Sequence, residues 1–181
     1  MKILVPMANG FEEMETTIIV DVFRRAGWTV TVAGIAGMRI RGSRGMTMIP
    51  DKPWEEVVPK RFDALVLPGG WDGAMALCIH GGVQEALRGF SEEGKWIGAI
   101  CAAPLALQSA GILAGRRFTC HPSVEKHLPK NSGRLADRVV VDENLITSQG
   151  PGTAFEFVLR FVEVAGKAPL AAKLRGELLL D

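Results

Sequence analysis

Short apolar runs alternate with amphipathic segments along most of the chain. The apolar runs have the length of strands and lie at residues 2–7, 28–33, 63–67 and 96–100, and further short strands are predicted at residues 116–120, 138–141 and 145–148. Helical periodicity predicts helices at residues 12–26, 82–93, 153–165 and 168–180, with one more beginning directly after residue 101. Because strands and helices alternate, we predict an α/β fold with a mostly parallel central sheet, in a single domain over residues 1–181.

Turn and cap residues mark several of the boundaries. Gly27 follows the last apolar position of the first helix and is expected to end it in a left-handed conformation. Residues 38–49 contain three turn-forming residues and are expected to form an irregular hairpin or an edge strand. Thr153 and Glu156 have the spacing of a capping box, which predicts the start of the next helix.

The helix predicted at 12–26 carries a carboxyl group on its apolar face. At about 100° per residue, Glu15 lies on the same side as Ile18, Ile19, Val22, Phe23 and Ala26. Glu13 lies on the opposite, polar side, and Glu12 and Glu13 both suit a first turn, where acidic side chains offset the helix dipole. Glu15 either offsets the helix dipole in the same way or acts as a functional acid. Burial on the apolar face would raise its pKa and favour the protonated form.

Cys101 lies where the apolar run 96–100 meets an alanine-rich, helix-forming run. This strand–nucleophile–helix order is typical of an elbow that holds a side chain up at a sheet edge. A neighbouring helix N-terminus would favour the thiolate, which is the reactive form. Free cysteines are also often inert core residues, and Cys78 and Cys120 are interpreted in that way. Three cysteines without a CxxC motif indicate neither a disulfide framework nor a zinc site.

Other special residues follow the predicted strands. In an open α/β sheet the ligand site lies beyond the carboxyl ends of the strands. Gly69 and Gly70 follow one strand and either form only a turn or direct backbone N–H groups at an oxyanion. His121 precedes a proline and is either structural or a proton relay. Its spacing from His127 does not suit a metal site, so we expect no metal.

The charge balance narrows the classes of partner. A formal net charge of +1 provides neither a basic surface for nucleic acid nor a polybasic patch for a membrane. The uncharged stretch 97–115 is interrupted by Gly98, Pro104 and Gly111, so a buried strand and helix explain it better than a membrane span. The N-terminal apolar stretch is too short for a signal-peptide core. We therefore expect a cytoplasmic protein that acts on a small substrate or a protein partner.

Taken together, these residues resemble the ThiJ/PfpI superfamily, and within it the branch of parkinsonism-associated deglycases and YajL-like proteins. The resemblance is carried by residues 10–15, 20–27, 67–70, 99–104 and 147–153. It implies a flavodoxin-like three-layer sandwich, usually as a homodimer, with no cofactor. The apolar residues Ile18, Ile19 and Val22 form either part of such a dimer surface or simply core.

The resemblance also assigns roles to residues. It makes Cys101 the nucleophilic, oxidation-prone thiol and Glu15 the buried glutamate beside it, and it places the amides of Gly70 and Ala102 in the pocket. His121 matches a histidine found near the cysteine in part of the family.

Arg25 and Arg44 match arginines near the pocket or the dimer contact. The residue after Cys101 is Ala102 rather than histidine, which argues against a Cys–His protease dyad.

Two functions follow as hypotheses. The first is a cofactor-independent glyoxalase III-type enzyme or deglycase, in which Cys101 forms a hemithioacetal with methylglyoxal or glyoxal, Glu15 moves the proton and His121 assists. The second is a redox-sensing stress-response protein or chaperone that acts through oxidation of Cys101. A thiamine-biosynthesis enzyme is a third and weaker interpretation, because it rests only on the naming of the family.

Overall fold

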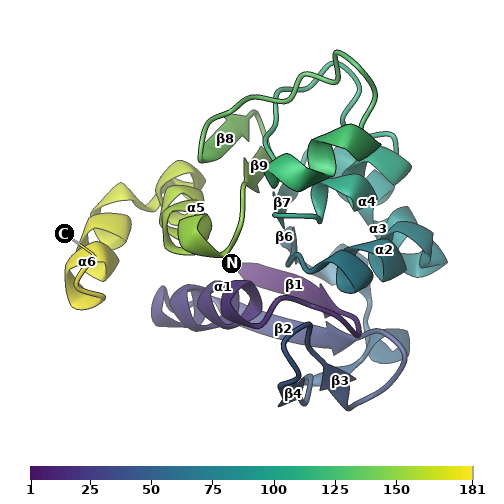
Figure 1. The fold of residues 1–181 in the computed structure, drawn as a ribbon. Helices are drawn as coiled ribbons and strands as arrows, with labels where there is room; N and C mark the ends of the chain where they lie inside the picture. Colours follow the sequence, from purple (N-terminus) through teal and green to yellow (C-terminus); the bar gives the residue numbers. More distant parts are fainter. Residues whose placement is uncertain (181) are drawn as a thin grey trace.

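A seven-stranded sheet forms the middle layer of the protein, for which a computed structural model describes residues 1–180 (Figure 1). In spatial order the strands are β5 (Lys52–Pro53), β2 (Thr29–Gly34), β1 (Lys2–Met7), β6 (Ala64–Leu67), β7 (Trp96–Ile100), β9 (Leu145–Ser148) and β8 (Val139–Asp142). All neighbours pair in parallel except β8, which is antiparallel to β9. The prediction of a mostly parallel α/β sheet is confirmed.

Helices cover both faces of this sheet (Figure 1). One face packs against α1 (Glu13–Arg25), α5 (Ala154–Val162) and α6 (Ala168–Glu177). The other face packs against α2 (Trp71–Ile79), α3 (Gly81–Glu92) and α4 (Pro104–Ser109). The shorter helical turns are Trp54–Glu56, Pro59–Arg61, Pro122–His127, Pro151–Thr153 and Glu163–Lys167. The resulting three layers are the sandwich that the resemblance implied.

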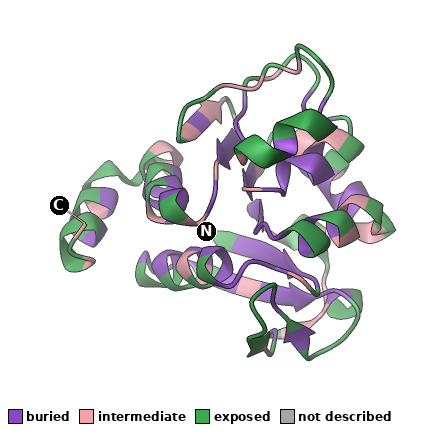
Figure 2. Ribbon diagram, in the orientation of Figure 1, coloured by how far each residue is buried: buried purple, intermediate pink, exposed green. Residues whose placement is uncertain are grey.

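The central strands β6 and β7 carry only apolar residues, and β1 does so after Lys2, because helices bury these strands on both sides. In β1, Ile3 and Val5 face the core under α1 and α5, whereas Leu4 faces the core under α2 to α4. In β6, Val66 faces the core under α1 and α5, and Leu65 faces the core under α2 to α4. Figure 2 shows the consequence, a mainly buried sheet between helices whose outer faces are exposed.

The first helix ends as predicted. Gly27 has φ +75°, and its N–H donates to the carbonyl oxygen of Arg24 while the N–H of Trp28 donates to that of Phe23. These two bonds form a Schellman motif, which satisfies carbonyl groups that the helix leaves free. The hairpin expected within residues 38–49 is also present, as the antiparallel strands β3 (Ile40–Arg41) and β4 (Thr47–Met48) outside the main sheet.

Two predicted details are wrong, and one helix was missed. Residues 116–120 form no strand of the sheet; Phe118 makes one isolated bridge to Arg134, and the N–H of Thr119 donates to the side chain of Thr147. The capping box predicted for Thr153 and Glu156 is absent. Thr153 Oγ1 is hydrogen-bonded to Ser148 and Gly150 instead, and Glu156 forms an ion pair with Arg138. The helix α2 was not predicted, since glycines and a tryptophan obscure its periodicity.

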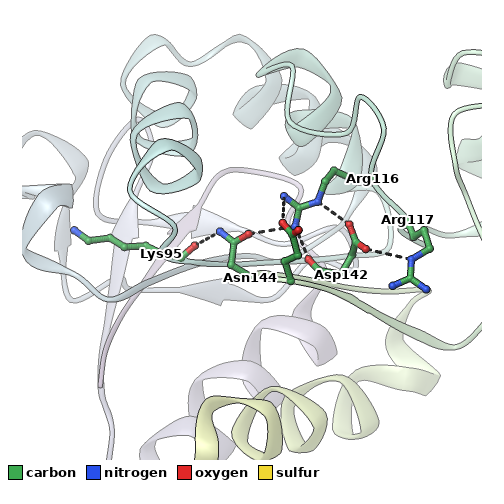
Figure 3. Close-up of polar contacts among 6 residues, drawn as sticks. Lys95, Arg116, Arg117, Asp142 and Asn144 are labelled. Atoms are coloured by element: carbon green, nitrogen blue, oxygen red, sulfur yellow. Dashed lines mark hydrogen bonds and ion pairs between the residues drawn. The ribbon is translucent and has the colours of Figure 1, made fainter.

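A polar cluster fastens the β8–β9 hairpin to the rest of the sheet (Figure 3). Arg116 Nε donates to Asp142 Oδ2 at 2.7 Å, and Arg117 Nε donates to Asp142 Oδ1 at 3.2 Å. Asn144 accepts from Arg116 and donates to the carbonyl oxygen of Lys95 at 2.7 Å. Because Lys95 directly precedes β7, the cluster anchors the strand whose other end leads to Cys101.

In the described part of the chain, every helix is too short or too polar to cross a membrane.

Candidate functional site

Cys101 directly follows the last residue of β7 and has the left-handed backbone of a nucleophile elbow. Its φ is +63°, a conformation that costs a non-glycine residue on the order of 1–3 kcal/mol. Two backbone hydrogen bonds hold it there: its N–H donates to Ser148 O at 2.9 Å, and its carbonyl oxygen accepts from His121 N–H at 3.0 Å. The helix α4 begins only at Pro104, after a turn at Ala102. The thiol is therefore held by the ends of the sheet rather than by a helix terminus.

Glu15 brings its carboxyl group to this thiol from the first turn of α1. The residue is 0% exposed, as its place on the apolar face predicted. Its Oε2 accepts a hydrogen bond from Gly69 N–H at 2.8 Å, and its side chain interacts with that of Cys101. Burial first, and then the negative charge of Glu12, raise the pKa of Glu15 to about 8. At neutral pH the carboxyl group is thus mostly protonated.

The pKa of the Cys101 thiol is also raised, and Glu15 is not the main cause. Burial, and then the charge of Glu15 when it is ionised, raise the pKa of Cys101 to about 12, although backbone N–H groups of Gly70 and Ala102 act in the opposite direction. The helix that was expected directly after Cys101 begins three residues later, at Pro104. Two adjacent buried acids resist carrying two charges, so they titrate as a pair. A thiolate forms here only while Glu15 keeps its proton.

Gly69 and Gly70 complete the site and do more than make a turn. A Cβ atom on Gly69 would lie 2.5 Å from Cys101 Cβ and 2.6 Å from Glu15 Oε2. Gly70 has φ +86°, and a Cβ atom there would collide with the backbone oxygen of Gly10. Only glycine allows this backbone to approach the acid and the thiol so closely. The backbone N–H groups of Gly70 and Ala102 face the sulfur, where they can stabilise negative charge.

His121 is joined to the site through its backbone. Its N–H bonds to Cys101, whereas its ring nitrogen Nδ1 contacts the hydroxyl group of Ser123 at 2.8 Å. The histidine is therefore adjacent to the elbow, with its imidazole oriented by Ser123.

The two arginines of the resemblance do not enter the site. Arg25 lies in the last turn of α1, in an ion pair with Asp21 at 2.6 Å. Arg44 contacts Glu13 through its backbone N–H, at 2.6 Å from Oε1.

The surroundings of Glu13 and Glu12 were the least predictable from the sequence. Glu13 was placed on the polar side, but it is only 4% exposed because residues 43–46 fold over it. Burial alone would raise its pKa, yet hydrogen bonds from Arg44, Ser43 and Met46 lower it overall. Glu12 is the N-cap of α1 and accepts from the N–H of Glu15. The acidic first turn was visible in the sequence, but the partners of each acid were not.

Among residues 1–180 no group of three or more His, Cys, Asp and Glu side chains is arranged to hold a metal ion.

The chain is similar to known proteins in both sequence and fold. A model of the DJ-1/PfpI family matches residues 1–164. Protein dj-1beta of Drosophila melanogaster is 43% identical over 179 residues, which cover 97% of this chain and 96% of that protein. The glutathione-independent glyoxalase DJR-1.2 of Caenorhabditis elegans is 38% identical over 162 residues, covering 89% of this chain and 86% of that protein. The solved structure of oxidized Toxoplasma gondii DJ-1 superposes with a TM-score of 0.93 at 36% identity, covering 98% of this chain and 97% of that one. The chain therefore belongs to the DJ-1/PfpI family.

Proposed function

We propose that this protein is a glutathione-independent glyoxalase of the glyoxalase III or deglycase type, with Cys101 as the nucleophile and Glu15 as the acid and base. One observation carries the proposal: a protonated, fully buried carboxyl group faces a thiol at a strained elbow. The names of the glyoxalase relatives support the reaction class. The substrate we propose is a small dicarbonyl such as methylglyoxal or glyoxal, or the adduct that it forms on another molecule.

At neutral pH the pair is mostly uncharged, so the reaction begins when the pair loses one proton and the resulting negative charge lies on the sulfur of Cys101. The Cys101 thiolate adds to the aldehyde carbon of methylglyoxal, and the carbonyl oxygen takes the proton of Glu15 to give a hemithioacetal. The N–H groups of Gly70 and Ala102 stabilise the charge that develops on this oxygen. His121, adjacent to the elbow, assists proton transfer.

The second stage moves a proton between the two former carbonyl carbons. Glu15, now a carboxylate, removes the proton from the carbon bonded to sulfur and delivers it to the neighbouring carbon, while the hydroxyl proton of the first carbon passes to the oxygen of the second. This leaves a thioester of lactate on Cys101. Water then adds to the thioester, lactate leaves, and the thiol–carboxyl pair returns to its starting charge. Methylglyoxal and one water molecule thus become lactate, with no external oxidant or cofactor.

The test is the formation of lactate from methylglyoxal in the absence of glutathione. We expect Cys101→Ser and Glu15→Gln to abolish turnover, while Cys78→Ser leaves it unchanged. Equal rates for all of these variants would refute the mechanism.

Redox sensing is the second candidate, and the same pair favours it. A protonated Glu15 beside Cys101 can hydrogen-bond the oxygen atoms of a sulfenic or sulfinic acid. Mass spectrometry after mild peroxide treatment tests this proposal. Selective oxidation of Cys101 supports it, and equal oxidation of Cys78 and Cys120 contradicts it.

We also propose a homodimer. Its contact surface does not include all of the residues Ile18, Ile19 and Val22 that the sequence suggested. Ile19 and Val22 are fully buried in the core and cannot contact a partner. Met14 and Met46 are each 59% exposed and line one shallow apolar depression with Ile18. Sedimentation of Met14→Lys tests this surface, with Ile79→Lys, at a still more exposed apolar residue of α2, as control. A dimer that dissociates only in the first variant is the expected result.

A further inference from the structure

The carboxyl group of Glu12 lies behind Glu15 and has no part in the reaction proposed above. Glu12 is 8% exposed, and its Oε2 accepts a hydrogen bond from the backbone N–H of Glu15 at 2.7 Å. Serine, threonine, asparagine and aspartate are the usual residues at such an N-cap, and glutamate is not. Across residues 1–180 no lysine, arginine or histidine forms an ion pair with it. An acidic side chain without an ion-pair partner thus occupies a position where a neutral cap would serve.

The backbone of Glu12 is joined to the other half of the site. Its N–H donates to the carbonyl oxygen of Gly69 at 3.0 Å, and the N–H of Gly69 in turn donates to Glu15 Oε2 at 2.8 Å. The neighbouring Gly70 packs so closely that a Cβ atom there would lie 2.7 Å from Glu12 N. Glu12 therefore holds the acid and the glycine turn in one rigid arrangement.

Few groups act on the carboxyl group of Glu15. Cys101 faces it from the elbow after β7, Gly69 donates to it from the turn after β6, and Glu12 lies beside it on α1. The Glu12 carboxylate is the one fixed charge among these groups, and it raises the pKa of Glu15.

We propose that Glu12 is a positioning residue that keeps the proton on Glu15. Its carboxylate fixes the backbone of Glu15 through the cap, and its uncompensated negative charge opposes ionisation of the neighbouring acid. The purpose of this arrangement rests on the function proposed above, because a protonated Glu15 is what allows Cys101 to form a thiolate and to pass a proton to the substrate. The arrangement itself can be measured without turnover.

The test is a pH titration of the Glu15 side chain by carbon-13 NMR of glutamate-labelled protein. The Glu15 signal is identified by its loss in Glu15→Gln. In the wild type we expect a midpoint near 8. In Glu12→Gln, which keeps an acceptor for the cap but loses the charge, we expect the midpoint to fall by on the order of one pH unit. Glu12→Asp keeps the charge and should keep the midpoint.

Glu13→Gln is the matched control, because it removes a neighbouring buried carboxylate whose partners are residues 43–46 rather than Glu15. An unchanged midpoint in Glu12→Gln, or equal shifts in both variants, would overturn the proposal. If Glu12→Gln does not fold, Glu12→Ser supplies a neutral cap with the same expected shift. Because no substrate is added, failure of the wild type to produce lactate would refute the proposed function and leave this titration intact.

Discussion

Replacing Glu15 by glutamine should make the protein more stable at neutral pH while it destroys the site. A buried acid whose pKa rises on folding is held protonated in the folded state, but it loses its proton freely in the unfolded chain. The folded state therefore binds more protons between pH 4.5, the ordinary value, and about pH 8. In that range the stability of the wild type falls as the pH rises.

The size of the effect follows from the pKa of about 8. Each pH unit above 4.5 lowers the free energy of unfolding by about 1.4 kcal/mol, which amounts to about 3 kcal/mol at pH 7. Glutamine has nearly the same shape, accepts the hydrogen bond of Gly69 and does not titrate. Below pH 4.5 the wild type escapes this penalty, so the stability difference between the two proteins should change by about 3 kcal/mol between pH 4 and pH 7, in favour of the variant.

Urea denaturation at pH 4, 5, 6 and 7 measures this difference directly. Glu13→Gln is the control of opposite sign, because hydrogen bonds lower the pKa of Glu13 in the folded protein. A lowered pKa adds stability above the unfolded value that is lost as the pH falls, so Glu13→Gln should cost most at pH 7. If the stability difference of Glu15→Gln is the same at pH 4 and pH 7, the reasoning about Glu15 is wrong.

Three further expectations concern the geometry around this acid and the sheet that carries it. Gly69→Ala should reduce the rates of lactate formation and of Cys101 alkylation on the order of 100-fold, because its Cβ would displace the acid and the thiol. Gly89→Ala, whose Cβ meets no atom within 4 Å, should leave both rates unchanged. Wild-type rates in Gly69→Ala would contradict this account. His121→Ala should slow lactate formation less than tenfold, since its ring is hydrogen-bonded to Ser123. A loss of rate as large as that of Cys101→Ser would instead show that the imidazole is essential. Arg116→Ala should lower the free energy of unfolding by about 2 kcal/mol, because it leaves the partly buried carboxylate of Asp142 with fewer donors. Urea denaturation that shows no change would refute this role of the cluster in Figure 3.

The amino-acid sequence by itself was enough to predict the framework of the site. Continuous apolar runs predicted buried parallel strands, since only strands covered on both faces lack polar positions. The place of Glu15 on an apolar helix face predicted its burial, and the apolar run before Cys101 predicted an elbow. These are local patterns, in which the spacing of neighbouring residues fixes which way a side chain points.

The tertiary structure alone decided which atoms meet and how they ionise. Glu13 is buried by residues 43–46, some thirty positions away, so no helical pattern could reveal it. Residues 116–120 were predicted as a strand, yet they form only one isolated bridge, between Phe118 and Arg134, and no ladder with the sheet. The pKa values of Cys101 and Glu15 depend on the desolvation of each group and on the charge of the other. Because these effects arise only when distant segments of the chain pack together, the sequence could single out Cys101 and Glu15 but could not show which of the two holds the proton.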